Sequence, residues 1–335
     1  MLKKLLLSLL TLGLVAVIGF NLAIWQFEQQ LNKSLNIEDE ELITISSGTS
    51  LSRFSKELVN KGWIDTRFWL RNYARLYPQK FNLKVGTYKV NQHDTLIGLV
   101  NRIVEGKEHQ LNVTFIEGST VKEWLEIIKA LPSLVITETS SSPEALAKFL
   151  KLDKSNPEGW LFPDTYSYTV GTKDTELYQR AYRKMKKELD ELWEARQGNL
   201  PYSNSYEALI MASIIEKETG VIDEQPIISS VFVNRLYKKM RLQTDPTIIY
   251  GLGERYQGDI TRAHKYEKTA YNTYRINGLP PTPIAMPGYS AIKAALNPTN
   301  DEYYYFVSKG NGSHYFSTTL KEHNAAVRKY QLGIK

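Results

Sequence analysis

The sequence predicts an α+β protein with a single N-terminal transmembrane helix, a small subdomain built from strand–turn–helix units, and a larger mixed α+β domain. One observation behind this prediction is an uncharged run from Leu5 to Trp25. Another is a strand–turn–helix pattern that recurs between residues 45 and 128. The roughly 300 residues after the apolar run are enough for two domains with ordinary cores.

The N-terminal run predicts one membrane-spanning helix over residues 5–25. Its length of about 21 residues is enough to cross a hydrocarbon core of about 30 Å. A cleaved signal peptide is the alternative, but its apolar region is shorter, and no A-x-A-like cleavage site follows Phe20. The sequence therefore favours an uncleaved anchor.

The charges around the run predict its orientation. Lys3 and Lys4 precede it and Glu28 follows it. The positive-inside rule then places residues 1–4 in the cytoplasm and the chain beyond the run outside, with residues 26–40 as a linker. The absence of cysteine fits an exported bacterial protein, although it is compatible with any compartment.

The net charge of +6 is compatible with nucleic acid, an anionic membrane surface or an acidic polymer as a partner. Export argues against nucleic acid. The densest basic run, residues 183–187, lies in a helical stretch followed by acidic residues, which indicates a solvated helix face rather than a phosphate-binding patch. We therefore expect no nucleic-acid partner.

A short pattern of apolar residue, turn, polar cap and amphipathic helix starts at residues 45, 90 and 115. The first two copies resemble the LysM module, a small peptidoglycan-binding fold, through Gly48-Thr49-Ser50-Leu51 and His93-Asp94-Thr95-Leu96. Neither copy has the whole G-D-T-L pattern of that module, so a plain spacer is the alternative. The resemblance predicts a LysM-like domain over residues 41–112.

The segment MASIIEKETG, residues 211–220, places a carboxylate at the end of an apolar helix that we expect to begin after Ser205. At about 100° per residue, Glu218 falls on the apolar stripe whereas Glu216 points away from it. Burial and the negative end of the helix dipole both disfavour the charged form, so we expect a raised pKa for Glu218. Such a group can protonate a leaving oxygen, as glycosidic cleavage requires. A structural ion-pair network is the alternative.

Three further segments are candidates for binding. Residues 158–166 combine aromatics with Asp164, which suits a sugar-stacking wall, although core aromatics and a turn-capping aspartate are the alternative. Pro246 biases Asp245 toward an extended conformation on a loop. Four of the thirteen prolines lie in residues 280–287, which predicts a rigid loop surface.

Several ordered motifs together resemble the MltG (YceG-like) endolytic murein transglycosylases, and the resemblance extends over nearly the whole chain. The motifs are Glu216-Lys217-Glu218-Thr219, Arg241-Leu242-Gln243-Thr244-Asp245-Pro246-Thr247, Ala270-Tyr271-Asn272-Thr273-Tyr274 and Gly278-Leu279-Pro280-Pro281. This resemblance implies a lytic transglycosylase anchored in the bacterial inner membrane and facing the periplasm, with residues 113–335 as its catalytic domain. Its expected substrate is the nascent glycan strand of peptidoglycan, and peptidoglycan synthases (penicillin-binding proteins) are its expected partners.

The resemblance also assigns the catalytic role to Glu218, the glutamate before threonine. Acting first as acid and then as base, it would cleave the β-1,4 bond between N-acetylmuramic acid and N-acetylglucosamine. The products would carry 1,6-anhydro ends, and cleavage would end strand growth. Polar residues of the same region are candidates for substrate binding, with loop bracing as the alternative: Gln243, Thr244, Asp245, Tyr250, Asn272 and Tyr274.

Two other functions remain open. A muramidase with Glu218 as acid and Asp164 or Asp245 as base would hydrolyse the same bond and leave reducing ends. A non-enzymatic peptidoglycan-binding scaffold would keep Glu218 as a structural residue. We expect no metal and no cofactor, because the five histidines lack metal-binding spacing and no P-loop, dinucleotide fingerprint or G-x-S-x-G motif occurs.

Overall fold

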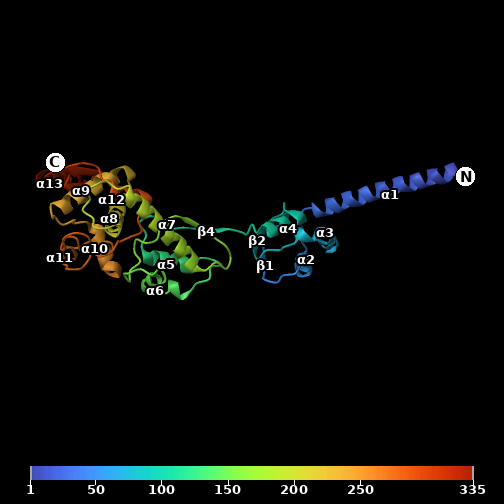
Figure 1. The fold of residues 1–335 in the computed structure, drawn as a ribbon. Helices are drawn as coiled ribbons and strands as arrows, with labels where there is room; N and C mark the ends of the chain where they lie inside the picture. The colour runs from blue at the N-terminus through green and yellow to red at the C-terminus, as the bar shows by residue number, and fades with distance from the viewer. Residues whose placement is uncertain (1, 334–335) are drawn as a thin grey trace. The chain divides into compact units, whose positions relative to one another are not determined.

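A computed structural model describes residues 2–333, and the chain divides into two compact units of mixed helix and sheet (Figure 1). Unit 1 comprises Met1–Leu111 together with Tyr168–Val170, and unit 2 comprises Asn112–Ser167 and Gly171–Lys335. Each unit has its own cluster of buried apolar side chains. The α+β class predicted from the sequence is therefore the class observed.

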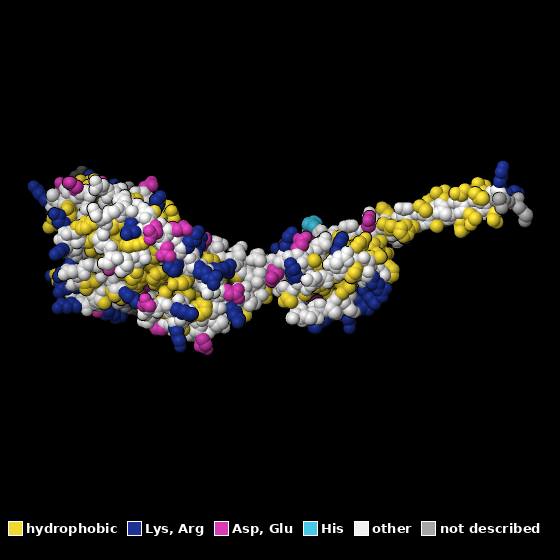
Figure 2. Space-filling model, in the orientation of Figure 1, with side chains coloured by type: hydrophobic (Ala, Val, Ile, Leu, Met, Phe, Trp, Pro, Cys, Tyr) yellow, Lys and Arg dark blue, Asp and Glu magenta, His cyan; other side chains and the backbone are white. Residues whose placement is uncertain are grey.

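The N-terminal helix α1 (Leu2–Leu31) is long and apolar enough to cross a membrane. Its large apolar side chains between Leu5 and Trp25 are exposed, and Figure 2 shows them covering this part of the helix in yellow. The helix continues past the predicted end at Trp25 because Phe27 and Leu31 pack into the core of unit 1. Phe27 meets Trp69 with ring centroids 6.0 Å apart.

The segment expected to be a linker, residues 26–40, differs from that expectation. Residues 26–31 belong to α1, and Leu31, Leu35 and Ile37 are all buried in the core of unit 1. The physical reason is the apolar spacing of these side chains, which lets the chain bury them instead of leaving an extended, solvated connection.

Unit 1 is built on an antiparallel strand pair, in which β1 (Glu41–Ile45) pairs with β2 (Gly86–Val90) and Ile43 lies opposite Tyr88. Both of these side chains are buried. The helices of this unit that follow α1 are α2 (Leu51–Asn60), α3 (Phe68–Leu76) and α4 (Leu96–Glu105), with a short 3-10 turn η1 (Pro78–Lys80).

The structure contains all three strand–turn–helix units predicted from the repeat. Ser50 caps α2, Thr95 caps α4, and Thr120 caps α5 (Val121–Ala130), each hydroxyl accepting from the backbone N–H three residues later at 3.1–3.3 Å. Such caps satisfy donors that a helix start leaves unpaired. The helix of the third copy, α5, belongs to unit 2, and the strand before it, β3 (Leu111–Thr114), pairs with β4 (Thr165–Tyr168).

The centre of unit 2 is α8 (Ser205–Glu218), which packs against α7 (Asp174–Glu194), α9 (Gln225–Tyr237) and α12 (Tyr289–Leu296). Asn204 caps this helix, one residue earlier than the Ser205 cap predicted from the sequence. Every residue from 208 to 215 is buried, so the helix is enclosed all round rather than along one stripe.

The remaining elements of unit 2 surround this core. They are η2 (Glu138–Ser140), α6 (Pro143–Phe149), η3 (Ile222–Glu224), α10 (Asp245–Leu252), η4 (Gly253–Arg255), α11 (Arg262–Tyr266), the antiparallel pair β5 (Tyr305–Ser308) and β6 (His314–Ser317), and α13 (Leu320–Tyr330).

Two sequence expectations differ from this part of the structure. Asp245 is the first residue of α10 rather than a loop residue, because proline is well accommodated in the first turn of a helix and Pro246 occupies that turn. The proline-rich loop is irregular as predicted, but residues 282–288 are buried rather than on the surface. The Ile284 N–H donates to Ser213 Oγ of α8 at 3.0 Å, which ties the loop to the core.

Candidate active site

The carboxyl end of α8 opens into a cavity of about 520 Å³ within unit 2. Its walls come from α9, the segment 242–245, the strands β5 and β6, and α13. The titratable and polar side chains that line it are Glu218, Arg235, Gln243, Asp245, Lys265, Tyr274, Tyr305, Ser308, His314, His323 and Gln331.

Glu218 is the last residue of α8 and its half-buried side chain reaches this cavity. The pKa of Glu218 is raised to about 7, chiefly by burial and also by the charge of Asp245, against a hydrogen bond from Thr244 and the charge of Arg235, which lower it. Both protonation states are therefore populated near neutral pH. A carboxyl group in this condition can donate a proton and accept one in successive steps.

Thr244 holds the carboxyl group of Glu218. Its hydroxyl donates to Glu218 Oε1, and its own backbone N–H donates to Thr273 Oγ1 at 3.0 Å. Its carbonyl accepts from the Thr247 hydroxyl at 2.7 Å. Thr244 is buried, so these bonds fix its side chain in the orientation that meets Glu218.

Arg235 places a buried guanidinium on the same cavity. Its Nε donates to the Tyr304 carbonyl at 2.6 Å and its Nη1 donates to the Leu242 carbonyl at 2.7 Å. Within the described part of the chain it forms no ion pair, and burial lowers its pKa although arginine stays charged. The backbone bonds thus hold a positive charge beside the Glu218 cavity.

The sequence analysis missed Arg235. The available signal was an arginine within the apolar stretch of α9, where a charge is costly unless it has partners. Those partners are backbone carbonyls outside α9, at Leu242 and Tyr304, which the apolar pattern of the helix does not reveal.

Three predicted substrate-binding residues line this cavity together with Glu218: Gln243, Asp245 and Tyr274. Thr244, also predicted to bind substrate, contacts Glu218 but does not line the cavity. The Tyr274 hydroxyl donates to Asp245 Oδ1 at 2.7 Å, and Lys265 Nζ lies 3.6 Å from the same oxygen. The Lys265 ammonium also lies 5.1 Å from the centre of the Tyr274 ring. Asp245 is thereby held between a hydroxyl and a cation.

The structure does not bring Tyr250 and Asn272 to the cavity. The Tyr250 hydroxyl donates to Glu158 Oε2 at 3.1 Å, and the Asn272 side chain donates to the Glu267 carbonyl at 2.7 Å. Asn272 is fully buried. Asn272 thus braces the backbone of residues 264–267, whereas Tyr250 is bonded to the side chains of Glu158 and Asn156.

The residues of the motif at 158–166 lie in different surroundings and have different roles. Phe162 belongs to the buried core, as the alternative interpretation expected, and Asp164 pairs with Lys184 away from the Glu218 cavity. Glu158 is buried, and burial raises its pKa to about 8. Trp160 is only half-buried and lines a different cavity.

Histidines complete one wall of the Glu218 cavity. The His314 ring meets Glu224 with Nδ1 and Oε2 2.7 Å apart, and His323 stacks on Tyr305 with centroids 5.2 Å apart. Across residues 2–333 there is no cluster of three or more His, Cys, Asp or Glu side chains placed to hold a metal ion.

A carboxyl group of raised pKa, oriented by a fixed hydroxyl and with a fixed cation on the same cavity, is an arrangement capable of general acid–base catalysis. A family model described as the YceG-like family matches residues 43–329. The chain belongs to this YceG-like family.

Known proteins similar to this chain include enzymes and a solved structure. A Bacillus subtilis protein named endolytic murein transglycosylase is 31% identical over 86% of this chain and 84% of its own length. A Streptococcus pneumoniae protein of the same name is 26% identical over 86% of this chain, which spans 58% of that longer protein. A crystal structure of a yceG-like protein from Listeria monocytogenes matches 87% of this chain and all of its own, with 31% identity and a TM-score of 0.55.

Proposed function

We propose that this chain is an endolytic lytic transglycosylase that cleaves the glycan strands of peptidoglycan. The observation that carries the proposal is Glu218, a protonatable carboxyl group on a cavity that Arg235 also lines, with a hydrogen bond from the Thr244 hydroxyl. The similarity to proteins named endolytic murein transglycosylases supports the same activity.

In the proposed reaction, protonated Glu218 donates its proton to the oxygen of the β-1,4 bond between N-acetylmuramic acid and N-acetylglucosamine. The bond from C1 of the muramic residue to that oxygen breaks, and positive charge develops at C1. The resulting carboxylate then takes the proton of the muramic 6-hydroxyl, whose oxygen forms a bond to C1. The product has a 1,6-anhydro end, and no water is consumed.

The neighbours of Glu218 have distinct roles in this proposal. Thr244 fixes the carboxyl group in orientation and favours its charged form through the hydrogen bond it donates. Arg235 positions the 242–243 backbone and adds positive potential. Gln243, Asp245 and Tyr274 face the cavity and would contact the acetamido and hydroxyl groups of the strand.

The proposal extends to the rest of the chain. We place α1 in the inner membrane with residues 1–4 in the cytoplasm, on the strength of its length, its apolar surface and the lysines at its start. Both units would then face the periplasm. The resemblance of residues 48–51 and 93–96 to the LysM turn is the basis for a LysM-like role of unit 1 in contacting glycan, and peptidoglycan synthases that supply nascent strands are the expected partners.

The test is product analysis with the full-length protein in detergent and uncrosslinked glycan strands. We expect mass spectrometry to find 1,6-anhydromuramic ends with the unchanged protein and none with Glu218→Gln. Internal cleavage should shorten long strands before any disaccharide accumulates, which separates endolytic from terminal cleavage.

A two-carboxylate hydrolase is the second candidate, because Asp245 lines the same cavity as Glu218. Reducing ends in the product analysis would favour it, with Asp245 rather than Asp164 as the second carboxylate. Intact strands with retained binding in both samples would instead indicate a peptidoglycan-binding scaffold.

A further inference from the structure

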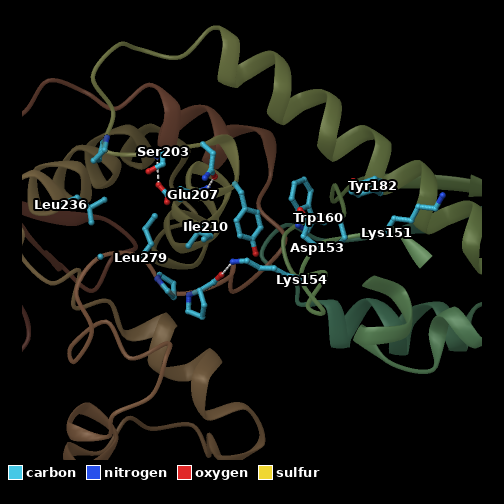
Figure 3. Close-up of a pocket in the computed structure, with 17 residues that line it drawn as sticks. Lys151, Asp153, Lys154, Trp160, Tyr182, Ser203, Glu207, Ile210, Leu236 and Leu279 are labelled. Carbon is cyan, nitrogen blue, oxygen red and sulfur yellow. Dashed lines mark hydrogen bonds between the residues drawn. The ribbon is translucent and has the colours of Figure 1, made fainter. Parts of the chain in front are cut away.

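A second cavity, of about 860 Å³, is lined by the first residues of α8, at the opposite end of that helix from Glu218. Figure 3 shows Trp160 and Tyr182 on one side of it, Leu236 and Leu279 on the other, and Ile210 between them. Its volume is within the range of cavities that enclose small ligands. None of the residues assigned to the proposed reaction lines this cavity.

Aromatic side chains form a prearranged wall of this cavity. The Trp160 ring stacks on Tyr206 with centroids 5.6 Å apart and planes 13° apart, and Lys154 Nζ lies 4.7 Å from the centre of the Tyr206 ring. The same ammonium donates to the Pro281 carbonyl at 2.7 Å. These contacts hold the aromatic faces in place before any ligand binds.

The turn that carries Trp160 is fixed against the proline-rich loop. Gly159 has a φ of +83°, and a Cβ at this position would lie 2.5 Å from Cγ of Pro283. Only glycine therefore allows the turn and the loop to approach this closely. The Trp160 turn and the proline-rich loop, which form two sides of the cavity, are therefore in direct contact.

The chemistry of the lining suits a saccharide. Half-buried Trp160 together with Ile210, Leu236 and Leu279 offers apolar surface to the C–H face of a pyranose ring, and Glu207 supplies a carboxylate for hydroxyl or amide groups. The Tyr206 ring also lines the cavity and adds to its aromatic surface.

The position of the cavity relates it to the candidate active site. Glu207 lies in the first turn of α8 and Glu218 is its last residue, which places them about 16 Å apart along the helix axis at about 1.5 Å per residue. A polymeric strand can contact both ends of one helix, whereas a short fragment bound at Glu218 cannot. We propose that the Trp160 cavity is a second saccharide-binding site that engages the glycan strand at sugars distant from the bond being cleaved; this rests on the proposed function.

The first test compares Trp160→Ala with Trp193→Ala in the full-length protein. Trp193 is a matched control because it is also half-buried against the same core but lines neither cavity. For Trp160→Ala we expect about a tenfold loss of kcat/KM on long glycan strands and little change on a tetrasaccharide. An equal loss on both substrates, or the same loss in the Trp193 variant, would overturn the proposal. Leu279→Ala provides a second, smaller change if Trp160→Ala does not fold.

A binding measurement separates this proposal from the proposed function. In a Glu218→Gln background, Trp160→Ala should weaken the affinity for long strands about tenfold, whether or not the protein cleaves them. The same weakening is expected with strands stripped of their stem peptides. If the effect of Trp160→Ala disappears on stripped strands, the cavity binds peptide and the saccharide proposal is wrong.

Discussion

The Thr244 hydroxyl donates a hydrogen bond to Oε1 of Glu218, although the two residues lie on different elements. This bond opposes the effect of burial on the pKa of Glu218. The two influences together leave the carboxyl group near the midpoint of its titration at neutral pH, where a single group serves best as both acid and base.

Replacing Thr244 by valine removes this bond while retaining the branched shape of the side chain. Because the bond favours the carboxylate, its loss should raise the pKa of Glu218 and move the corresponding limb of the pH–rate profile to higher pH. We expect kcat/KM to fall about tenfold at neutral pH. Thr244→Ser keeps the hydroxyl and is the control, so an unchanged profile in the valine variant would contradict this role.

The titration of Glu218 should also appear in the stability of the protein. Its pKa in the folded state, about 7, is above the ordinary value of 4.5, so the folded state binds more protons between these pH values. Stability contributed by the protonated form is therefore full below about pH 4.5 and is lost as the pH rises through 7. Glu218→Gln cannot ionise and should be more stable than the unchanged protein at pH 8, by about 2 kcal/mol after allowance for partial exposure.

The measurement is denaturant unfolding of both proteins at pH 5 and pH 8. The stability difference between them should grow with pH. An equal difference at both values would mean that the pKa of Glu218 is not raised by folding. Glu207→Gln, a change on the same helix at a group outside the Glu218 cavity, controls for the loss of a charge.

Two substitutions of Arg235 separate the effect of its charge on Glu218 from the effect of its hydrogen bonds on the backbone. Arg235→Gln removes a cation that lowers the pKa of Glu218, so this pKa should rise, and the Tyr304 and Leu242 carbonyls should lose donors. Arg235→Lys retains the charge but cannot reproduce two separately directed donors. We expect both variants to lose about 2–4 kcal/mol of stability and about tenfold or more in kcat/KM. Only the glutamine variant should shift the pH–rate profile, and a shift of equal size in both would contradict the role of charge.

Local features of the chain predicted much of the fold. The hydroxyl caps at Ser50, Thr95 and Thr120 act on backbone N–H groups three residues away, so the sequence pattern contains the whole interaction. The carboxylate at the end of α8 was likewise visible because the apolarity of the helix and its terminal position are both local.

The site beyond Glu218 depended on contacts between distant segments. Arg235 is held by carbonyls of residues 242 and 304, and no spacing within α9 indicates them. At Asp245 two local rules conflicted, since proline disfavours helix in the preceding residue but favours a helix start. The contacts of α10 with α8 fit the second outcome, and Asp245 begins the helix.

Substitution of Tyr250 tests whether this residue, predicted to bind substrate, instead stabilises the fold. Its hydroxyl donates to the buried carboxyl group of Glu158, which also accepts from the Val121 N–H at 2.9 Å. Tyr250→Phe leaves the carboxyl group with one donor fewer, so we expect a loss of about 1–2 kcal/mol in unfolding free energy. Because the hydroxyl does not reach the Glu218 cavity, kcat/KM of the folded variant should stay within about twofold of the unchanged protein.

Tyr274→Phe is the matched comparison, since it removes a tyrosine hydroxyl that faces the cavity. It should lower kcat/KM clearly and change the unfolding free energy little. If Tyr250→Phe instead lowered kcat/KM more than Tyr274→Phe did, Tyr250 would be a substrate-binding residue after all.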